Sequence, residues 1–247
     1  MIKYTIYYFS CFIFLTFSNN CIIKCHAKEN FIIAIDIGHS KNKSGAVSAR
    51  GTEEYHFNRS IAIMLLEELF QDGFDKTFII NEKGIDISLI ERTYIAKKKK
   101  ADLFISIHHD SVQPDYLSFW IYKEKKLYFC DLFHGYSIFY SEQNIQSKKS
   151  LFFAHLLGTA LRNNSFIPSL HHAEPIKGEN RKLIDPEKGI YRFDDLIVLK
   201  NTKMPAILLE CGIILNRNEE ILLTQQSYKR RIVLSIRQAI KKYIDQQ

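Results

Sequence analysis

The sequence predicts a single α/β domain with a mostly parallel, twisted sheet that helices cover on both faces. Short apolar runs alternate along the chain with amphipathic segments, which is the order of elements in a doubly wound sheet. Several runs (IIAIDI, LFISI and AILLE) are almost continuously apolar, as strands are when both faces of their sheet are covered. The predicted domain, residues 31–245, is long enough to bury one sizeable core.

The individual elements follow from the spacing of apolar residues. Short apolar runs predict strands, in chain order, at Phe31–Gly38, Thr77–Asn81, Leu103–His108, Leu117–Tyr122, Tyr136–Tyr140, Leu196–Lys200 and Pro205–Cys211. Apolar residues that recur every three or four positions predict helices at Tyr55–Gln71, Ile87–Lys100, Ser150–Arg162 and Ser227–Ile244. In the last of these helices Ile232, Ile236 and Ile240 form one apolar stripe, so we expect the helix to pack on the sheet.

The stretch Asn163–Arg192 is the one long region without strong periodicity. It contains three prolines and two glycines, and we expect it to form an ordered surface excursion near the functional site. Three of its polar residues, His172, Asn180 and Arg181, either line a substrate groove or belong to a surface loop, and the residues alone favour neither reading.

Residues 1–27 have the pattern of a secretory signal peptide. Lys3 supplies the positive charge, and Tyr4–Phe17 is an apolar run of 14 residues, shorter than the roughly 18 that a membrane-spanning helix needs. Small residues at Cys25 and Ala27 fit a cleavage site, although an uncleaved anchor is the alternative. We therefore expect an exported protein, periplasmic or extracellular, with no transmembrane span after signal removal.

The net charge and the cysteine content leave several possibilities open for binding partners and for a disulfide bond. The chain carries a formal net charge of +7, which suits an anionic cell-wall polymer or membrane surface but also a basic protein without any charged partner. No basic stretch is interleaved with aromatic residues, so we expect no nucleic-acid partner. Beyond the signal, Cys130 and Cys211 remain, and they either form a disulfide or are buried free thiols.

Four polar residues end or follow apolar runs and suggest a metal centre. His39, His108 and Glu210 lie at the carboxyl ends of predicted strands, and Glu54 begins a helix after the loop that His39 opens. The carboxyl ends of parallel strands form the rim where such sheets place their sites. Histidine and carboxylate bind a catalytic zinc, and a further carboxylate can act as a base, so a metallohydrolase is expected. On chemistry alone, the neighbouring Glu53 or His109 could replace Glu54 or His108.

Four sequence motifs occur in order around these residues. They are DIGH at 36–39 with GA at 45–46, GTEE at 51–54, RT at 92–93 followed by ADLFISIH at 101–108, and P-x-x-L-x-E-x-G-I-x-x-N at 205–216. On these motifs the chain resembles the zinc-dependent N-acetylmuramoyl-L-alanine amidases, a family of bacterial cell-division and autolytic enzymes. The sequence departs from the family pattern at Ile37, Ser40 and Lys41, where proline and two glycines are usual, which leaves the shape of the first loop open.

The resemblance implies a function and assigns roles to the four residues. It implies that His39, Glu54 and His108 bind one Zn²⁺ and that Glu210 is the catalytic glutamate. It also implies that residues 31–245 form a zinc amidase catalytic domain, whose substrate is peptidoglycan and whose scissile bond joins N-acetylmuramic acid to L-alanine. Some relatives need an activator protein to move a blocking helix, and Lys123–Ser147 is the place for such a helix, although it reads mainly as strand and loop. The rival interpretations are a zinc peptidase acting on stem peptides and a non-catalytic wall-binding relative.

Overall fold

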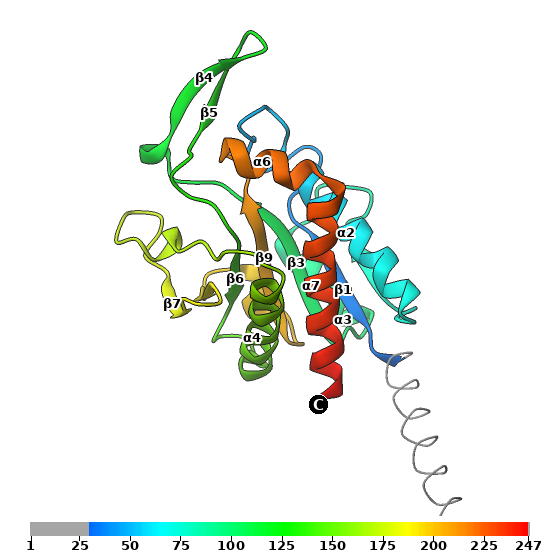
Figure 1. Ribbon diagram of the computed structural model, residues 1–247. Coiled ribbons are helices and arrows are strands. Elements are labelled where there is room, and N and C mark those ends of the chain that lie inside the picture. Colours follow the sequence, from blue (N-terminus) through cyan, green and yellow to red (C-terminus); the bar gives the residue numbers. More distant parts are fainter. Residues whose placement is uncertain (1–29, 247) are drawn as a thin grey trace, which may run out of the picture.

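A seven-stranded mixed sheet lies at the centre of the computed structural model, which describes residues 30–246. The predicted signal peptide at residues 1–27 lies outside the described residues. The strands run in the order β2-β1-β3-β9-β6-β8-β7 (Figure 1). Their bounds are β1 Ile33–Ile37, β2 Phe78–Ile80, β3 Leu103–Asp110, β6 Ser137–Tyr140, β7 Lys182–Asp185, β8 Ile190–Arg192 and β9 Ala206–Ile213.

The strands that carry the predicted metal centre all run in the same direction. β1 is parallel to β2 and to β3, and β3 is parallel to β9, so these four strands end at the same edge of the sheet. Beyond β9 the direction changes, because β6 is antiparallel to β9, β8 is parallel to β6, and β7 is antiparallel to β8. The predicted α/β class with a mostly parallel sheet is confirmed.

Helices cover both faces of the sheet. Side chains alternate between the faces of a strand, so Ile33 and Ile35 point into one core layer while Ala34 points into the other. Helices α2, α4 and α7 close the first layer, with α7 lying along the near side of the sheet in Figure 1, and α3 and α5 close the second. The helix bounds are α2 Glu54–Gln71, α3 Leu89–Lys98, α4 Ser147–Asn163, α5 Ile197–Asn201, α6 Arg217–Thr224 and α7 Gln226–Asp245.

Local sequence explains where several helices begin and how they pack. The Ser88 side chain accepts a hydrogen bond from the backbone N–H of Glu91 and so caps α3. Asn216 caps α6 in the same way. The predicted stripe on α7 is confirmed, since Ile232, Ile236 and Ile240 are all buried.

One predicted strand is wrong. Leu196–Lys200 was expected to be a strand, but residues Ile197–Asn201 form the short helix α5. The place beside β9 that such a strand would need is taken by β6. A short apolar run fits a strand or a buried helical turn equally well, and here Val198 and Leu199 pack with Leu208 on the second face of the sheet.

A separate hairpin projects beyond the sheet (Figure 1). It consists of β4 Ser118–Tyr122, which was predicted, and β5 Lys125–Phe129, which was not. The two residues of its turn, Lys123 and Glu124, both have positive φ, as a tight two-residue hairpin turn requires. Residues 123–146 form strands and turns and contain no helix, as the sequence favoured.

The stretch Asn163–Arg192 is ordered, as predicted, but it is not confined to the surface. It contributes β7 and β8 to one edge of the sheet and a short 3-10 turn, η2 His171–Ala173, whose two histidines are buried. Segments as short as β7, β8 and η2 contain too few residues to show a periodicity, so the sequence does not predict them. Cys130 and Cys211 are both buried and unbridged, which answers the question that their spacing left open.

Candidate metal centre

The side chains of His39, Glu54 and His108 converge at the carboxyl edge of the parallel strands. His39 follows β1, Glu54 is the first residue of α2, and His108 lies near the end of β3. The His39 Nε2 atom is 2.9 Å from Glu54 Oε2, and the His108 Nδ1 atom is 3.1 Å from Glu54 Oε1. One ligand atom from each residue lies within 4.8 Å of the other two. Two imidazole nitrogens and a carboxylate oxygen form the donor set of a three-ligand catalytic zinc site, so these residues fit that ion.

The two neighbouring candidates, Glu53 and His109, lie apart from this group. Glu53 is partly exposed and lies 3.7 Å from His56, and it is not among the residues whose ligand atoms converge. His109 is buried on the other face of β3, where its Nδ1 atom is 2.8 Å from Asn58 Oδ1. Burial lowers the pKa of His109 to about 3, which keeps its ring neutral.

Glu54 is the most buried of the three ligands and is held as a carboxylate. Burial alone would raise its pKa, but hydrogen bonds from His108 and His39 outweigh burial and lower the pKa well below the usual range. Asn58 Nδ2 donates to Glu54 Oε1 at 3.0 Å, and the Ala46 N–H donates to Oε2 at 3.1 Å. Outer hydrogen bonds of this kind fix the orientation of a ligating carboxylate.

Two glycines leave the space that the side chains of His39, Glu54 and His108 occupy. A Cβ atom on Gly45 would lie 2.3 Å from Glu54 Oε2 and 2.6 Å from the His39 ring, and Gly45 has a φ of +79°. A Cβ atom on Gly38 would lie 2.4 Å from the His108 ring. Both glycines belong to the first sequence motif, and any larger residue would occupy the space in which the ligand atoms meet.

The loop that follows His39 is held by side-chain contacts where the family pattern has glycines. Ser40 Oγ accepts a hydrogen bond from the Lys43 N–H at 3.0 Å, and Ser40 also bonds to Asp86. His39 itself has a φ of +68°, in the left-handed region that is costly for most residues. The loop therefore has a defined shape without the two glycines, because side-chain hydrogen bonds stabilise it.

Arg92 on α3 holds the backbone of the same loop. Its Nη1 atom donates to Asp36 Oδ1 at 2.7 Å, and its Nη2 atom donates to the carbonyl oxygen of His39 at 2.6 Å. Both Arg92 and Asp36 are buried. Arg92 belongs to the third sequence motif, but its role was not predicted; the available signal was an arginine on a helix that was expected to pack on the sheet.

Glu210 lies on β9 directly beside His108 on β3 in the parallel register. Its Oε2 atom is inaccessible to solvent and has no hydrogen-bond partner. This burial raises the pKa of Glu210 well above its usual value, and the nearby Asp110 and Glu54 carboxylates raise it further. Burial and the two carboxylates therefore favour the protonated form of Glu210 more than in an exposed glutamate.

The order of the motifs and the geometry of the site agree with the comparison with known proteins. The sequence profile of N-acetylmuramoyl-L-alanine amidases matches residues 33–242. The chain belongs to this family. It is therefore an amidase, a hydrolase that acts on peptidoglycan, as its motifs predicted.

Individual relatives show how far the similarity extends. A relative from Buchnera aphidicola is 30% identical over 225 residues, which cover 86% of this chain and 95% of the relative. N-acetylmuramoyl-L-alanine amidase AmiA of Escherichia coli is 25% identical over 222 residues, covering 86% of this chain and 75% of AmiA. The crystal structure of the amidase Ami1 from Mycobacterium smegmatis has the same fold, with a TM-score of 0.70 and 18% identity over 88% of this chain and 98% of Ami1.

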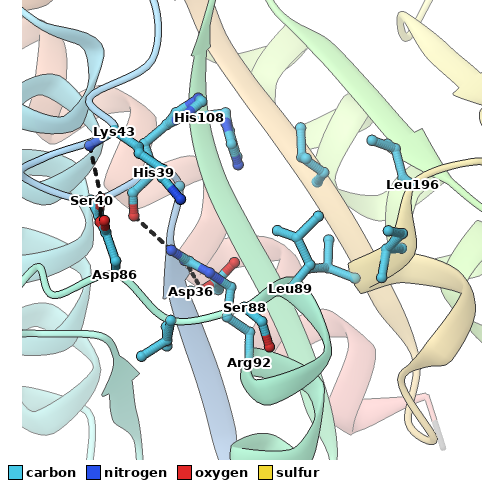
Figure 2. Close-up of a pocket in the computed structure, with 15 residues that line it drawn as sticks. Asp36, His39, Ser40, Lys43, Asp86, Ser88, Leu89, Arg92, His108 and Leu196 are labelled. Atoms are coloured by element: carbon cyan, nitrogen blue, oxygen red, sulfur yellow. Dashed lines mark hydrogen bonds and ion pairs between the residues drawn. The ribbon is translucent and has the colours of Figure 1, made fainter.

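A groove of about 560 Å³ passes the metal centre of the amidase (Figure 2). His39 and His108 lie at its polar end, and Leu89 and Leu196 form part of an apolar wall. The α5 turn, where a strand was predicted, contributes to this wall. The groove therefore offers a surface for substrate beside the ligand atoms.

Two of the three predicted substrate-binding residues line a cavity beside Glu210, and the third does not. His172 and Arg181 line a smaller cavity together with Glu210, whereas Asn180 does not line it and is exposed. Arg181 stacks on Phe193, with its guanidinium carbon 3.8 Å from the ring centre. His172 is buried against Asp110; burial would lower its pKa, but the Asp110 and Glu179 carboxylates raise it to about 9.

No helix within residues 30–246 combines the length and the apolar character that crossing a membrane requires. His56 is exposed and lies 3.7 Å from Glu53, and the partly exposed His155 lies 3.3 Å from Asp185, and neither histidine belongs to the candidate metal centre.

Proposed function

We propose that this amidase is zinc-dependent, with His39, Glu54 and His108 as the metal ligands and Glu210 as the catalytic acid and base. The observation that supports it best is the placement of the desolvated Glu210 carboxyl group in register beside His108, next to three converging ligand atoms. A site that only bound cell wall would have no need for this carboxyl group.

The chemistry follows from the two parts of the site. Zinc, when bound, would lower the pKa of a water ligand and polarise the scissile carbonyl group. Glu210 takes the proton of the attacking water and later passes it to the leaving amine, which must depart protonated. The raised pKa of Glu210 suits both transfers, because a strongly acidic carboxyl group would accept the proton poorly.

The proposed substrate bond is the amide between the lactyl group of N-acetylmuramic acid and the first L-alanine of the stem peptide. The groove beside the ligands has a polar end for the reacting amide and an apolar wall for the remainder of the substrate. We propose that residues 1–27 direct export to the periplasm or cell wall, where the enzyme remodels the wall or separates daughter cells. An activator protein would not have to displace a helix from residues 123–146, because this segment forms strands and turns.

Digestion of purified peptidoglycan tests the proposal. New free lactyl groups together with new amino-terminal L-alanine are expected, and shortened stem peptides without free lactyl groups would instead indicate a peptidase. Removal of metal with a chelator should stop the reaction, and addition of zinc should restore it. Release that continues at the same rate in the metal-free protein would contradict the zinc assignment.

A further inference from the structure

A second group of two histidines and a carboxylate lies outside the predicted metal centre. It consists of Asp110, the last residue of β3, and of His171 and His172 on η2. The Asp110 Oδ2 atom is 2.8 Å from His172 Nε2 and 3.3 Å from His171 Nε2. All three residues are at least nine-tenths buried, with exposed fractions of 9%, 4% and 8% for Asp110, His171 and His172.

The outer nitrogen of each histidine already has a partner. His172 Nδ1 is 2.8 Å from Glu179 Oε2, and His171 Nδ1 is 2.8 Å from Ser169 Oγ. A carboxylate only accepts hydrogen bonds, so the Nδ1 atom of His172 carries the proton. In the neutral ring, the lone pair of Nε2 then points at the negatively charged Asp110. That arrangement is repulsive unless a positive charge lies between the two groups.

A proton on His172 would supply this charge in the metal-free protein, in line with the raised pKa of that histidine, but it would leave His171 Nε2 without a partner. Asp110 Oδ2, His171 Nε2 and His172 Nε2 are all buried without a hydrogen-bond partner, although they approach one another closely. Three buried polar atoms without partners would be costly. A cation bound by all three lone pairs would remove that cost.

The spacing of the three atoms also fits a metal ion. Ligands at 2.0–2.1 Å around a tetrahedral zinc lie about 3.3 Å from one another. A histidine that ligates a metal almost always donates its other N–H to a carboxylate or another acceptor, as His172 does to Glu179. Gln113 in turn holds Glu179, with its Nε2 atom 2.8 Å from Oε1. We propose that Asp110, His171 and His172 bind a second divalent metal ion of the zinc class.

The position of this second site suggests what the ion does. It joins the end of β3 to the excursion between α4 and β8, which carries Arg181. Arg181, His172 and Glu210 border the same cavity. The second ion therefore fixes one wall of the substrate cavity, while the His39 group serves the reaction.

Metal content per chain tests the inference without any assay of activity. Tag-free protein is incubated with excess zinc, dialysed against metal-free buffer and measured by mass spectrometry. We expect two zinc ions in the wild type, one in His39→Ala, one in His171→Ala and none in the double variant. His155→Ala, a partly exposed histidine outside both groups, should keep two. One ion in the wild type that His39→Ala removes and His171→Ala leaves in place would overturn the proposal.

A titration separates this proposal from the proposed function. Zinc added to metal-free His39→Ala protein, followed by calorimetry, should fill one site, and the absence of binding would overturn the second site even if His171→Ala does not fold. If His39→Ala instead retains the full wild-type zinc content, the assignment of the catalytic ligands fails, whereas the second site is still judged by His171→Ala alone.

Discussion

Arg92 donates to Asp36 at 2.7 Å inside the core, and its other terminal nitrogen holds the carbonyl oxygen of His39. The first metal ligand therefore depends on a residue 53 positions later in the chain. Because His39 has a positive φ, the loop needs this support to keep the imidazole facing Glu54.

Replacement of Arg92 should cost stability. Arg92→Ala leaves Asp36 buried without its ion-pair partner, and we expect a loss of about 3–5 kcal/mol in the free energy of unfolding. Urea unfolding measures this loss. Arg59→Ala, an exposed arginine on α2, should change stability by no more than about 0.5 kcal/mol. Equal effects of the two variants would show that the Arg92 contacts contribute nothing.

Gly45→Ala should remove metal binding at the His39 group, because the new Cβ atom would occupy the space of Glu54 Oε2 and the His39 ring. Gly73→Ala is the matched control: Gly73 has a similar φ of +85°, but a Cβ atom there would meet nothing within 4 Å. Both variants should lose about 1–2 kcal/mol from backbone strain. Only Gly45→Ala should lose one metal ion per chain by mass spectrometry, and a Gly45→Ala protein with the full wild-type metal content would refute the crowding argument.

Glu210→Gln and Glu54→Gln should fail in different ways. Glu210→Gln leaves the three proposed ligand side chains unchanged and should therefore retain metal at the His39 group. Its turnover should nevertheless fall about 10²–10⁴-fold, because no group remains to transfer the proton. Glu54→Gln should lose both the metal at the His39 group and the activity. Glu53→Gln, one residue earlier and partly exposed, should behave as the wild type. Release of soluble fragments from dyed peptidoglycan, together with metal analysis, compares the three variants. Wild-type turnover by Glu210→Gln would exclude it as the base.

Asp72→Asn should lower stability in a pH-dependent way. Arg237 on α7 donates two hydrogen bonds to Asp72 at the end of α2, and this contact lowers the pKa of Asp72. A depressed pKa in the folded state adds stability above the unfolded value of about 3.9, and this stability is lost as the pH falls through the folded pKa. At pH 7 we expect a loss of about 1–3 kcal/mol in metal-free protein.

The same measurement at low pH supplies the check for Asp72. The difference in unfolding free energy between wild type and Asp72→Asn should shrink as the pH falls from about 4 through the lowered folded-state pKa of Asp72, below which both side chains are uncharged. Asp75→Asn, an exposed neighbour, should show little effect at either pH. A difference that stays constant with pH would mean that the ionised carboxylate is not the source of the stability.

Sequence predicted the catalytic edge of the fold well, because strand ends and motif order are local properties. His39, Glu54 and His108 do meet, and Glu210 lies beside them. The parts that sequence missed depend on distant partners. The run at 196–200 forms a helix that packs on the second face of the sheet, and the pairing of Asp110 with His171 and His172 joins segments about sixty residues apart in the sequence. No local pattern records such a contact.

The order of strands in the sheet has a consequence for the way the chain folds. β3 and β9 are adjacent and parallel, with Phe104 opposite Ala206, so this pairing closes a loop of roughly a hundred residues. Non-local parallel pairing of this kind is slow compared with helix formation. His39 and Glu54 come together early through a short loop, but His108 and Glu210 become neighbours only when that large loop closes. The capture of metal by a refolding chain should therefore mark the completion of the sheet and not its nucleation.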